Sequence, residues 1–114
     1  MPLGININEH SFKIIVIALS GRLDAFEAPG LRKLCDDFIA QNEAHFVLDL
    51  TDLNMLDSAG LAVMVSVLKR ARQQGGDVRL IWPVDETAGR ILRLTKFDQV
   101  FSSITRAEIL PGGF

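Results

Sequence analysis

The sequence predicts an α/β domain in which a small mixed sheet of four to five strands packs against about four helices. The chain has 114 residues, which is enough for one domain and too few for two ordinary ones. Hydrophobic residues make up 48% of it, so it can bury one substantial core. Short apolar runs alternate with longer segments whose apolar positions recur every three or four residues. That alternation is typical of strands joined by helical crossovers. We expect one domain over residues 1–114, with its core over residues 3–110 and a frayed C-terminal end.

Two neighbouring strands are expected at the start of the chain. Leu3, Ile5 and Ile7 alternate with smaller or polar residues, which is the period of a strand with one buried face. Residues 12–19 are nearly all apolar and many are β-branched, as in a strand that is covered on both faces. Because only a short polar turn separates the two runs, they are close enough to pair as a hairpin.

A first helix is predicted over about residues 28–41, after a turn at residues 20–24. Pro29 suits the first turn of a helix, where the missing N–H of proline has little cost. The apolar residues then recur at helical spacing: Leu31, Leu34, Cys35 and Phe38. Cys35 is the only cysteine and falls within this stripe, so we interpret it as a buried, inert thiol and not as a nucleophile.

A second helix is predicted from Ser58 to about Gln74. Its expected core stripe consists of Leu61, Met64, Val65 and Leu68. Val63 and Val67 lie off that stripe, where they either pack in the core or form an exposed patch for a partner, and we expect at least one of them to be exposed. The remaining expected elements are strands at residues 46–50 and 78–82, a loop at 51–56, a helix that begins at Asp85 or Glu86, a last short strand within 97–104 and a short helix at 105–110.

Ser58 is the most suggestive single residue, because it lies where a loop becomes a helix. Serine is a favoured N-cap, and the free N–H groups and dipole of a helix start also accommodate a phosphate group. Ala59 and Gly60 leave the hydroxyl uncrowded and easy for another protein to reach. Considered alone, Ser58 is interpreted as an N-cap only, since most serines at helix starts have that role.

Four polar residues follow or lie near the ends of predicted strands: Asp24, Asp49, Asp57 and Ser58. In sheets with parallel neighbours, functional residues gather at the carboxyl ends of strands, so we expect these four to converge on one edge. Three scattered acids are weak evidence for a cation site, and we interpret the carboxylates as solvated or capping groups. His10 and His45 are not spaced with Cys35 as a metal set, so no metal site is predicted.

The sequence gives no sign of catalysis, nucleic-acid binding or membrane insertion. The net charge is −2, without the basic excess that is typical of nucleic-acid binding. There is no G-x-x-x-x-G-K loop, no dinucleotide fingerprint and no hydrolase-like base for Ser58, so we expect neither an enzyme nor a bound cofactor. No apolar run approaches the roughly 18 residues of a membrane span and no signal peptide is visible, so a cytosolic location is expected.

Three blocks of the sequence resemble the signature blocks of STAS domains, and more narrowly those of the bacterial anti-sigma factor antagonists. They are Gly21-Arg22-Leu23-Asp24, Leu48-Asp49-Leu50-Thr51 and Met55-Leu56-Asp57-Ser58-Ala59-Gly60-Leu61. The resemblance covers about residues 3–110 and implies a single STAS domain. Two positions depart from the family pattern. Ala59 stands where serine or threonine is frequent, which leaves Ser58 as the only hydroxyl of its block, and Lys96 stands where glycine is frequent.

The resemblance implies a partner switch. In that family, the unphosphorylated antagonist binds an anti-sigma factor that is also a serine kinase of the histidine-kinase-like ATPase fold, and the sigma factor is thereby released. The kinase phosphorylates the antagonist, and a PP2C-type serine phosphatase restores it. Carried over by position, the phosphorylated residue is Ser58. The partner-binding residues implied by the resemblance are Asp24, Asp57, Ser58, Ala59, Gly60, Leu61 and Val63.

Three other functions stay open. A STAS module without a phosphorylation switch would serve in a transport or stressosome-like assembly. A switching protein could control secretion, motility or biofilm formation in place of a sigma factor. A small hydrolase or nucleotide-binding protein is the third alternative, for which the sequence offers no phosphate-binding loop.

Overall fold

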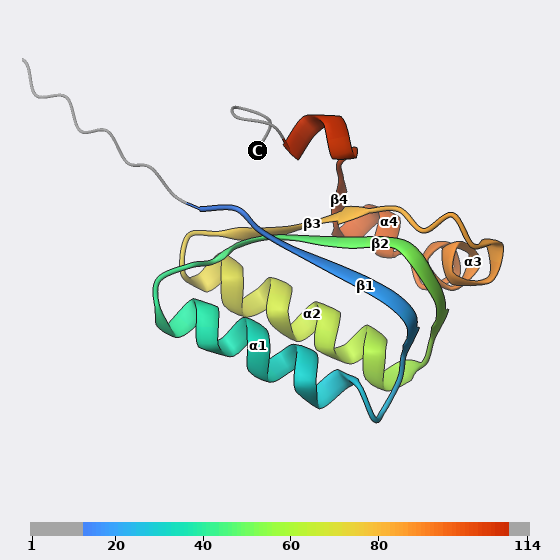
Figure 1. The fold of residues 1–114 in the computed structure, drawn as a ribbon, viewed down its shortest axis with the longest axis horizontal. Coiled ribbons are helices and arrows are strands. Elements are labelled where there is room, and N and C mark those ends of the chain that lie inside the picture. The colour runs from blue at the N-terminus through green and yellow to red at the C-terminus, as the bar shows by residue number, and fades with distance from the viewer. Residues whose placement is uncertain (1–12, 110–114) are drawn as a thin grey trace, which may run out of the picture.

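The computed structural model describes residues 13–109, in which strands and helices alternate as the sequence predicts (Figure 1). In chain order the elements are β1 (Ile15–Leu23), α1 (Ala28–Ala40), β2 (His45–Leu56), α2 (Ser58–Gln73), β3 (Asp77–Ile81), α3 (Glu86–Leu94), α4 (Phe97–Val100), β4 (Ser102–Ser103) and the short 3-10 helix η1 (Arg106–Ile109). Over this described range the sheet has four strands in the order β1-β2-β3-β4, and each neighbouring pair is parallel. The α/β prediction is confirmed, while the expected first strand at residues 3–7 and its hairpin lie outside the described residues.

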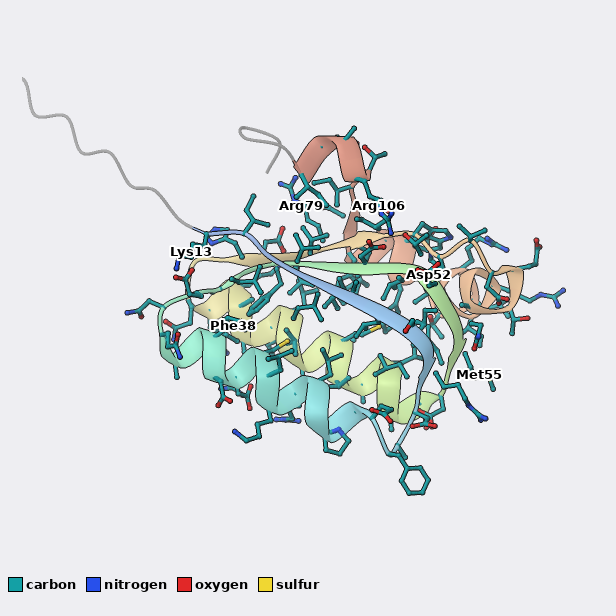
Figure 2. All side chains as sticks on the ribbon, viewed as in Figure 1. Lys13, Phe38, Asp52, Met55, Arg79 and Arg106 are labelled. Atoms are coloured by element: carbon teal, nitrogen blue, oxygen red, sulfur yellow. The ribbon has the colours of Figure 1, made fainter. Side chains whose placement is uncertain are left out.

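The sheet separates two apolar layers of unequal size. Helices α1 and α2 lie side by side on one face, and η1 lies on the other (Figure 1). Successive side chains of β2 point into the two layers in turn, because side chains alternate between the faces of a sheet along a strand. Phe46 and Leu48 belong to the large core beneath the helices, whereas Val47 packs with Ile81 and Ile104 on the opposite face. Figure 2 shows Arg106 on that second face, away from the two helices.

The core stripe of α2 differs from the predicted one. Val63 and Val67 are 5% and 1% exposed, so the expectation that at least one of them is exposed was wrong. Val65, which was expected in the core, is exposed instead. The true stripe includes two small residues, Gly60 and Ala71, which a search for large apolar residues leaves out. Small residues on a buried face allow a helix to approach its neighbour closely, and Gly60 and Ala71 share the buried face of α2 with Val63 and Val67.

Both β1 and β2 run further than predicted. The turn expected at residues 20–24 and the loop expected at 51–56 are mostly strand, in which Arg22 pairs with Met55 and Leu23 with Leu56. The register shifts between Ala18 and Ser20 and again after Gly21, so the pairing is irregular. Polar residues in the second half of β2 interrupt the apolar run there, which is why the sequence pattern suggested a loop. The extension carries the ends of β1 and β2 together to the start of α2.

The C-terminal half agrees closely with the predictions. Asp85 caps α3 by accepting a hydrogen bond from the Ala88 N–H at 3.0 Å, and Glu86 is the first residue of the helix. Residues 97–104 form α4 followed by the two-residue strand β4, in place of a strand alone. Lys96 has φ of 62° between α3 and α4, a left-handed conformation that glycine adopts most readily.

Across residues 13–109, no helix has both the length and the apolarity that a membrane crossing requires.

Candidate functional site

The ends of β1 and β2 bring two separate segments of the chain together. Leu23 and Leu56 are the last paired residues of the two strands, and the Asp57 N–H donates to the Leu23 carbonyl oxygen at 3.3 Å. The loop that leaves β1 therefore lies against the first turn of α2 (Figure 1). This arrangement places Asp24, Asp57 and Ser58 at one end of the sheet, as the sequence predicts for three of the four polar residues.

Asp57, not Ser58, is the N-cap of α2. Asp57 has extended backbone angles, and its Oδ1 accepts a hydrogen bond from the Gly60 N–H at 2.9 Å. Aspartate caps helices as well as serine does, and here it stands one residue earlier, so the expectation that Ser58 is the cap was wrong. Ser58 is the first residue of the helix and is exposed. Because Asp57 supplies the cap, the Ser58 hydroxyl is not required for it.

The same Asp57 carboxylate also holds the loop after β1. Its Oδ2 accepts a hydrogen bond from the Ala25 N–H at 3.0 Å, across 32 residues of sequence. Each oxygen of Asp57 thus binds a backbone N–H of a different segment. Carboxylates that accept backbone N–H bonds form the stronger class of hydrogen bonds. Asp57 therefore fixes the position of the loop relative to the residue that follows it, Ser58.

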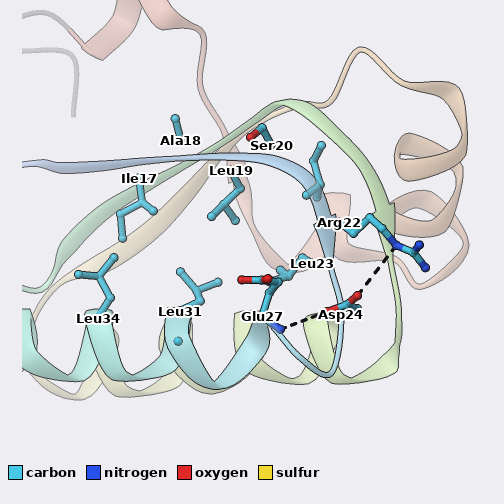
Figure 3. A pocket seen from close by; sticks show the side chains of 12 residues that line it. Ile17, Ala18, Leu19, Ser20, Arg22, Leu23, Asp24, Glu27, Leu31 and Leu34 are labelled. Atoms are coloured by element: carbon cyan, nitrogen blue, oxygen red, sulfur yellow. Dashed lines mark hydrogen bonds and ion pairs between the residues drawn. The ribbon is translucent and has the colours of Figure 1, made fainter.

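Asp24 shapes that loop from within. Its Oδ1 accepts hydrogen bonds from the N–H groups of Phe26 and Glu27 at 3.0 and 3.1 Å. Its carbonyl oxygen accepts one from the Ala28 N–H at 2.8 Å, which leads the chain into α1. The Arg22 Nε lies 3.9 Å from the Asp24 Oδ2, and Figure 3 shows the two side chains facing each other. The predicted role of Asp24 in partner binding is thus accompanied by a structural role in ordering the loop.

Gly60 is required by the contact between α2 and β1. A Cβ atom at this position would lie 2.4 Å from the Leu23 carbonyl oxygen, which real side chains essentially never do. Of the other predicted partner-binding residues in α2, Ala59 and Leu61 are half-buried and Val63 is buried. Ser58 is therefore the most accessible member of the predicted set in this helix.

Two grooves adjoin this end of the molecule. One lies between the N-terminal halves of α1 and α2 and encloses about 320 Å³. It is lined by Ala25, Ala28, Pro29, Arg32, Ala59, Ala62 and Val63. The other, of about 630 Å³, runs between β1 and α1, where Figure 3 shows Ile17, Leu19 and Leu31 pointing toward one another. Val63 borders the first groove although little of its own surface is exposed.

Phe26 is a surface feature that the sequence analysis missed. It lies in the loop between β1 and α1, and the residue is 92% exposed to solvent. The available signal was its place in the sequence: an aromatic residue between a strand and the proline of a helix start, outside either periodic apolar pattern.

Asp49 does not join this cluster. It is 6% exposed and lies on the opposite face of the sheet, where it binds Arg106 at 2.9 Å and accepts hydrogen bonds from the backbone and hydroxyl of Thr51. Burial alone would raise the pKa of Asp49, but the bonds from Thr51 and Arg106 outweigh it and hold the pKa below its ordinary value. The expected convergence of four residues was therefore wrong for Asp49, because β2 continues seven residues beyond it.

Within residues 13–109, no group of three or more His, Cys, Asp or Glu side chains is arranged to hold a metal ion.

The interpretation of Cys35 as a buried thiol is confirmed. Its side chain is fully buried in the core between α1 and the sheet. Burial, together with the nearby carboxylate of Asp36, raises the pKa of Cys35 to about 12. Since the thiolate is the reactive form, the folded protein keeps this group unreactive at neutral pH.

Comparison with known proteins identifies the family of this chain. Residues 6–108 match the STAS domain. The chain belongs to the STAS domain family. The anti-sigma-B factor antagonist of Bacillus subtilis (strain 168) is 31% identical over 80 residues, which cover 70% of this chain and 69% of that protein. The anti-sigma F factor antagonist of Paenibacillus polymyxa is 27% identical over 110 residues, which cover 90% of this chain and 93% of that protein.

Solved STAS structures have the same fold. The anti-sigma factor antagonist SpoIIAA in its unphosphorylated form superposes with a TM-score of 0.74 at 19% identity, covering 89% of this chain and 88% of that one. The resemblance to STAS domains seen in the sequence is thus confirmed at the level of family and fold.

Proposed function

We propose that this STAS protein is an anti-sigma factor antagonist whose binding is switched by phosphorylation of Ser58. In its unphosphorylated form it binds an anti-sigma factor that is also a serine kinase of the histidine-kinase-like ATPase fold, and the sigma factor is released. Phosphorylation of Ser58 ends that binding, and a PP2C-type phosphatase reverses the modification. With such partners, the protein is expected to act in the cytosol. The observation that carries the proposal is the exposed Ser58 on the first turn of α2, next to a cap that Asp57 supplies.

The position of Ser58 suits a charge switch that leaves the fold intact. A phosphate group adds about −1.5 to −2 charge at neutral pH. The start of a helix tolerates that charge, because its dipole and free N–H groups favour an anion. The cap on Gly60 comes from Asp57, so modification of Ser58 removes no hydrogen bond of the cap. Phosphorylation should therefore change the surface more than the fold.

The switch acts on the partner through charge. Asp24 and Asp57 already place two carboxylates at this end of the sheet, and the phosphate would add to them. Docking of a protein over Ser58 would then bury a phosphate group beside two carboxylates, and the loss of hydration of these charges opposes binding. A difference of about 3–4 kcal/mol between the two states changes affinity by roughly two to three decades.

The test is intact-mass analysis after incubation with the cognate ATPase-type anti-sigma factor and ATP, with fragmentation to locate the phosphate. We expect one phosphate on Ser58, none in Ser58→Ala, and normal labelling in the control Ser102→Ala, which removes an exposed serine from β4. In binding assays, Ser58→Ala should bind constitutively and Ser58→Asp weakly. Stable binding without any phosphate transfer would reduce the protein to an interaction module. Tight binding by both Ser58→Asp and the phosphorylated protein would contradict the switch.

A further inference from the structure

The loop between β1 and α1 presents an aromatic side chain that has no packing role in the folded chain. Phe26 is 92% exposed, the highest value among the large hydrophobic residues over residues 13–109 that are described as exposed. A phenyl ring left in water gives up the stabilisation that burial would bring. Large aromatic residues are enriched among the few side chains that dominate protein interfaces. An isolated exposed apolar residue needs no explanation in general, so the surroundings of Phe26 decide its meaning.

Hydrogen bonds on both sides of Phe26 hold its backbone in place. The Phe26 N–H donates to the Asp24 Oδ1 at 3.0 Å, and the preceding Ala25 N–H donates to the Asp57 Oδ2 at 3.0 Å. After Phe26, the Ala28 N–H donates to the Asp24 carbonyl oxygen at 2.8 Å. The ring thus projects from an ordered turn. A preorganised anchor loses less conformational entropy on binding than one on a free loop.

The same contacts tie Phe26 to the proposed switch. One carboxylate, that of Asp57, caps the helix that begins with Ser58 and also binds Ala25, the neighbour of Phe26. The groove of about 320 Å³ between α1 and α2 starts at Ala25 and Ala59, the residues adjacent to Phe26 and Ser58. A protein that covers Ser58 therefore meets the projecting ring and the apolar groove on one continuous surface.

The charge around Phe26 argues against a second copy of the chain as the occupant. Asp24, Glu27 and Asp57 place three carboxylates beside the loop, against the guanidinium groups of Arg22 and Arg32. The excess is negative, and it grows when Ser58 is phosphorylated. A second copy of the chain would bring the same excess against itself. The occupant is therefore a different protein, and the part of it that meets the Phe26 ring is an apolar pocket.

We propose that Phe26 is the anchor of the partner interface: its ring inserts into an apolar pocket on the anti-sigma factor that covers Ser58. The groove between α1 and α2 receives an apolar side chain of that protein. The proposal rests on the proposed function and adds the residue that supplies affinity. Phe26 holds the partner, and the charge at Ser58 decides whether it stays. The two residues therefore have separable effects.

The experiment measures the affinity of the full chain for its cognate anti-sigma factor by isothermal titration calorimetry. Phe26→Ala should weaken binding by roughly thirtyfold or more, as expected for a dominant interface residue, and Phe26→Leu should recover part of the loss. The matched control is Leu94→Ala, because Leu94 is 75% exposed but lies at the end of α3. That control should bind within about twofold of the wild type. The thermal midpoint of Phe26→Ala should equal that of the wild type, because the ring packs against nothing in the folded chain.

A kinetic readout separates this inference from the proposed function. If Phe26 acts only in docking, Phe26→Ala should raise the KM for phosphorylation of Ser58 and leave kcat nearly unchanged. Wild-type affinity of Phe26→Ala, with phosphorylation of Ser58 still abolishing binding, would overturn the anchor and leave the switch standing. Failure of the wild-type chain to bind the anti-sigma factor would overturn both. Concentration-dependent dimerisation of the chain that Phe26→Ala removes would assign the ring to a second copy and overturn the proposed partner.

Discussion

Two glycines at equivalent helix positions offer a sharp test of the close contact between α2 and β1. Gly60 and Gly30 are each the third residue of their helices, α2 and α1. In an open helical position, replacing glycine with alanine stabilises by about 0.5–1 kcal/mol, because alanine loses less backbone entropy on folding. A Cβ at Gly30 meets nothing within 4 Å, so Gly30→Ala should gain this amount. A Cβ at Gly60 would lie 2.4 Å from the Leu23 carbonyl oxygen, so the backbone itself must move.

The balance at Gly60 favours destabilisation. Overpacking costs about 1–3 kcal/mol, and a clash with backbone belongs to the upper part of that range, at about 2–3 kcal/mol. Subtracting the propensity gain of about 0.5–1 kcal/mol leaves a net loss of about 1–2.5 kcal/mol. For a domain of this size that loss lowers the thermal midpoint by roughly 4–20 °C, whereas Gly30→Ala should raise it by roughly 2–8 °C. Thermal unfolding followed by circular dichroism measures both shifts. A Gly60→Ala protein as stable as Gly30→Ala would refute the packing of α2 against the end of β1.

Three further predictions concern the residues around the sheet. Asp57→Ala removes both the cap of α2 and the bond to Ala25, so urea unfolding should show a loss of about 1–3 kcal/mol; the control Asp37→Ala, from an exposed ion pair within α1, should cost no more than about 0.5 kcal/mol. Because the pKa of Asp49 is held below its ordinary value, its stabilising contribution is complete above that ordinary value of about 4 and is lost as the pH falls through the lower folded-state pKa. The difference in unfolding free energy between wild type and Asp49→Asn should accordingly narrow as the pH is lowered from 6 toward 3, and a constant difference would argue against the ionised bond to Arg106. Cys35, with its pKa raised to about 12, should react with a thiol reagent at pH 8 only as fast as the chain unfolds, so rapid labelling under native conditions would contradict its burial.

The sequence predicts the order of elements well because local patterns determine it. The apolar run before Leu19, the proline at the start of α1 and the acid that caps α3 each act through their own neighbours in the chain. The C-terminal ends of β1 and β2 were missed because they are polar in sequence, which suggested a turn and a loop. They are strand because Leu23 pairs with Leu56, and this tertiary contact leaves no local pattern in the sequence. Periodicity alone does not identify the buried face of a helix that is apolar nearly all round.

The site was predicted only where the chain brings neighbours together. Asp57 and Ser58 are adjacent, and the approach of Asp24 follows from two parallel strands that end together. Asp49 was misplaced because the strand was expected to end at Leu50, directly after it, whereas β2 continues to Leu56. The exposure of Phe26 depends on where α1 and α2 lie, and it is therefore visible only once the tertiary structure is known.

The division of labour between Asp57 and Ser58 explains how a switch can act without unfolding its carrier. If Ser58 supplied the cap, phosphorylation would alter the hydrogen bond that starts α2, and the charge state would be coupled to stability. With Asp57 as the cap, the fold keeps its bonds to Gly60 and Ala25 in either state. The proposed modification then changes charge on a surface whose shape is already fixed. A change of this kind affects only a protein that docks on that surface. The proposed switch therefore needs no conformational change, and the added charge acts directly on the affinity for the partner.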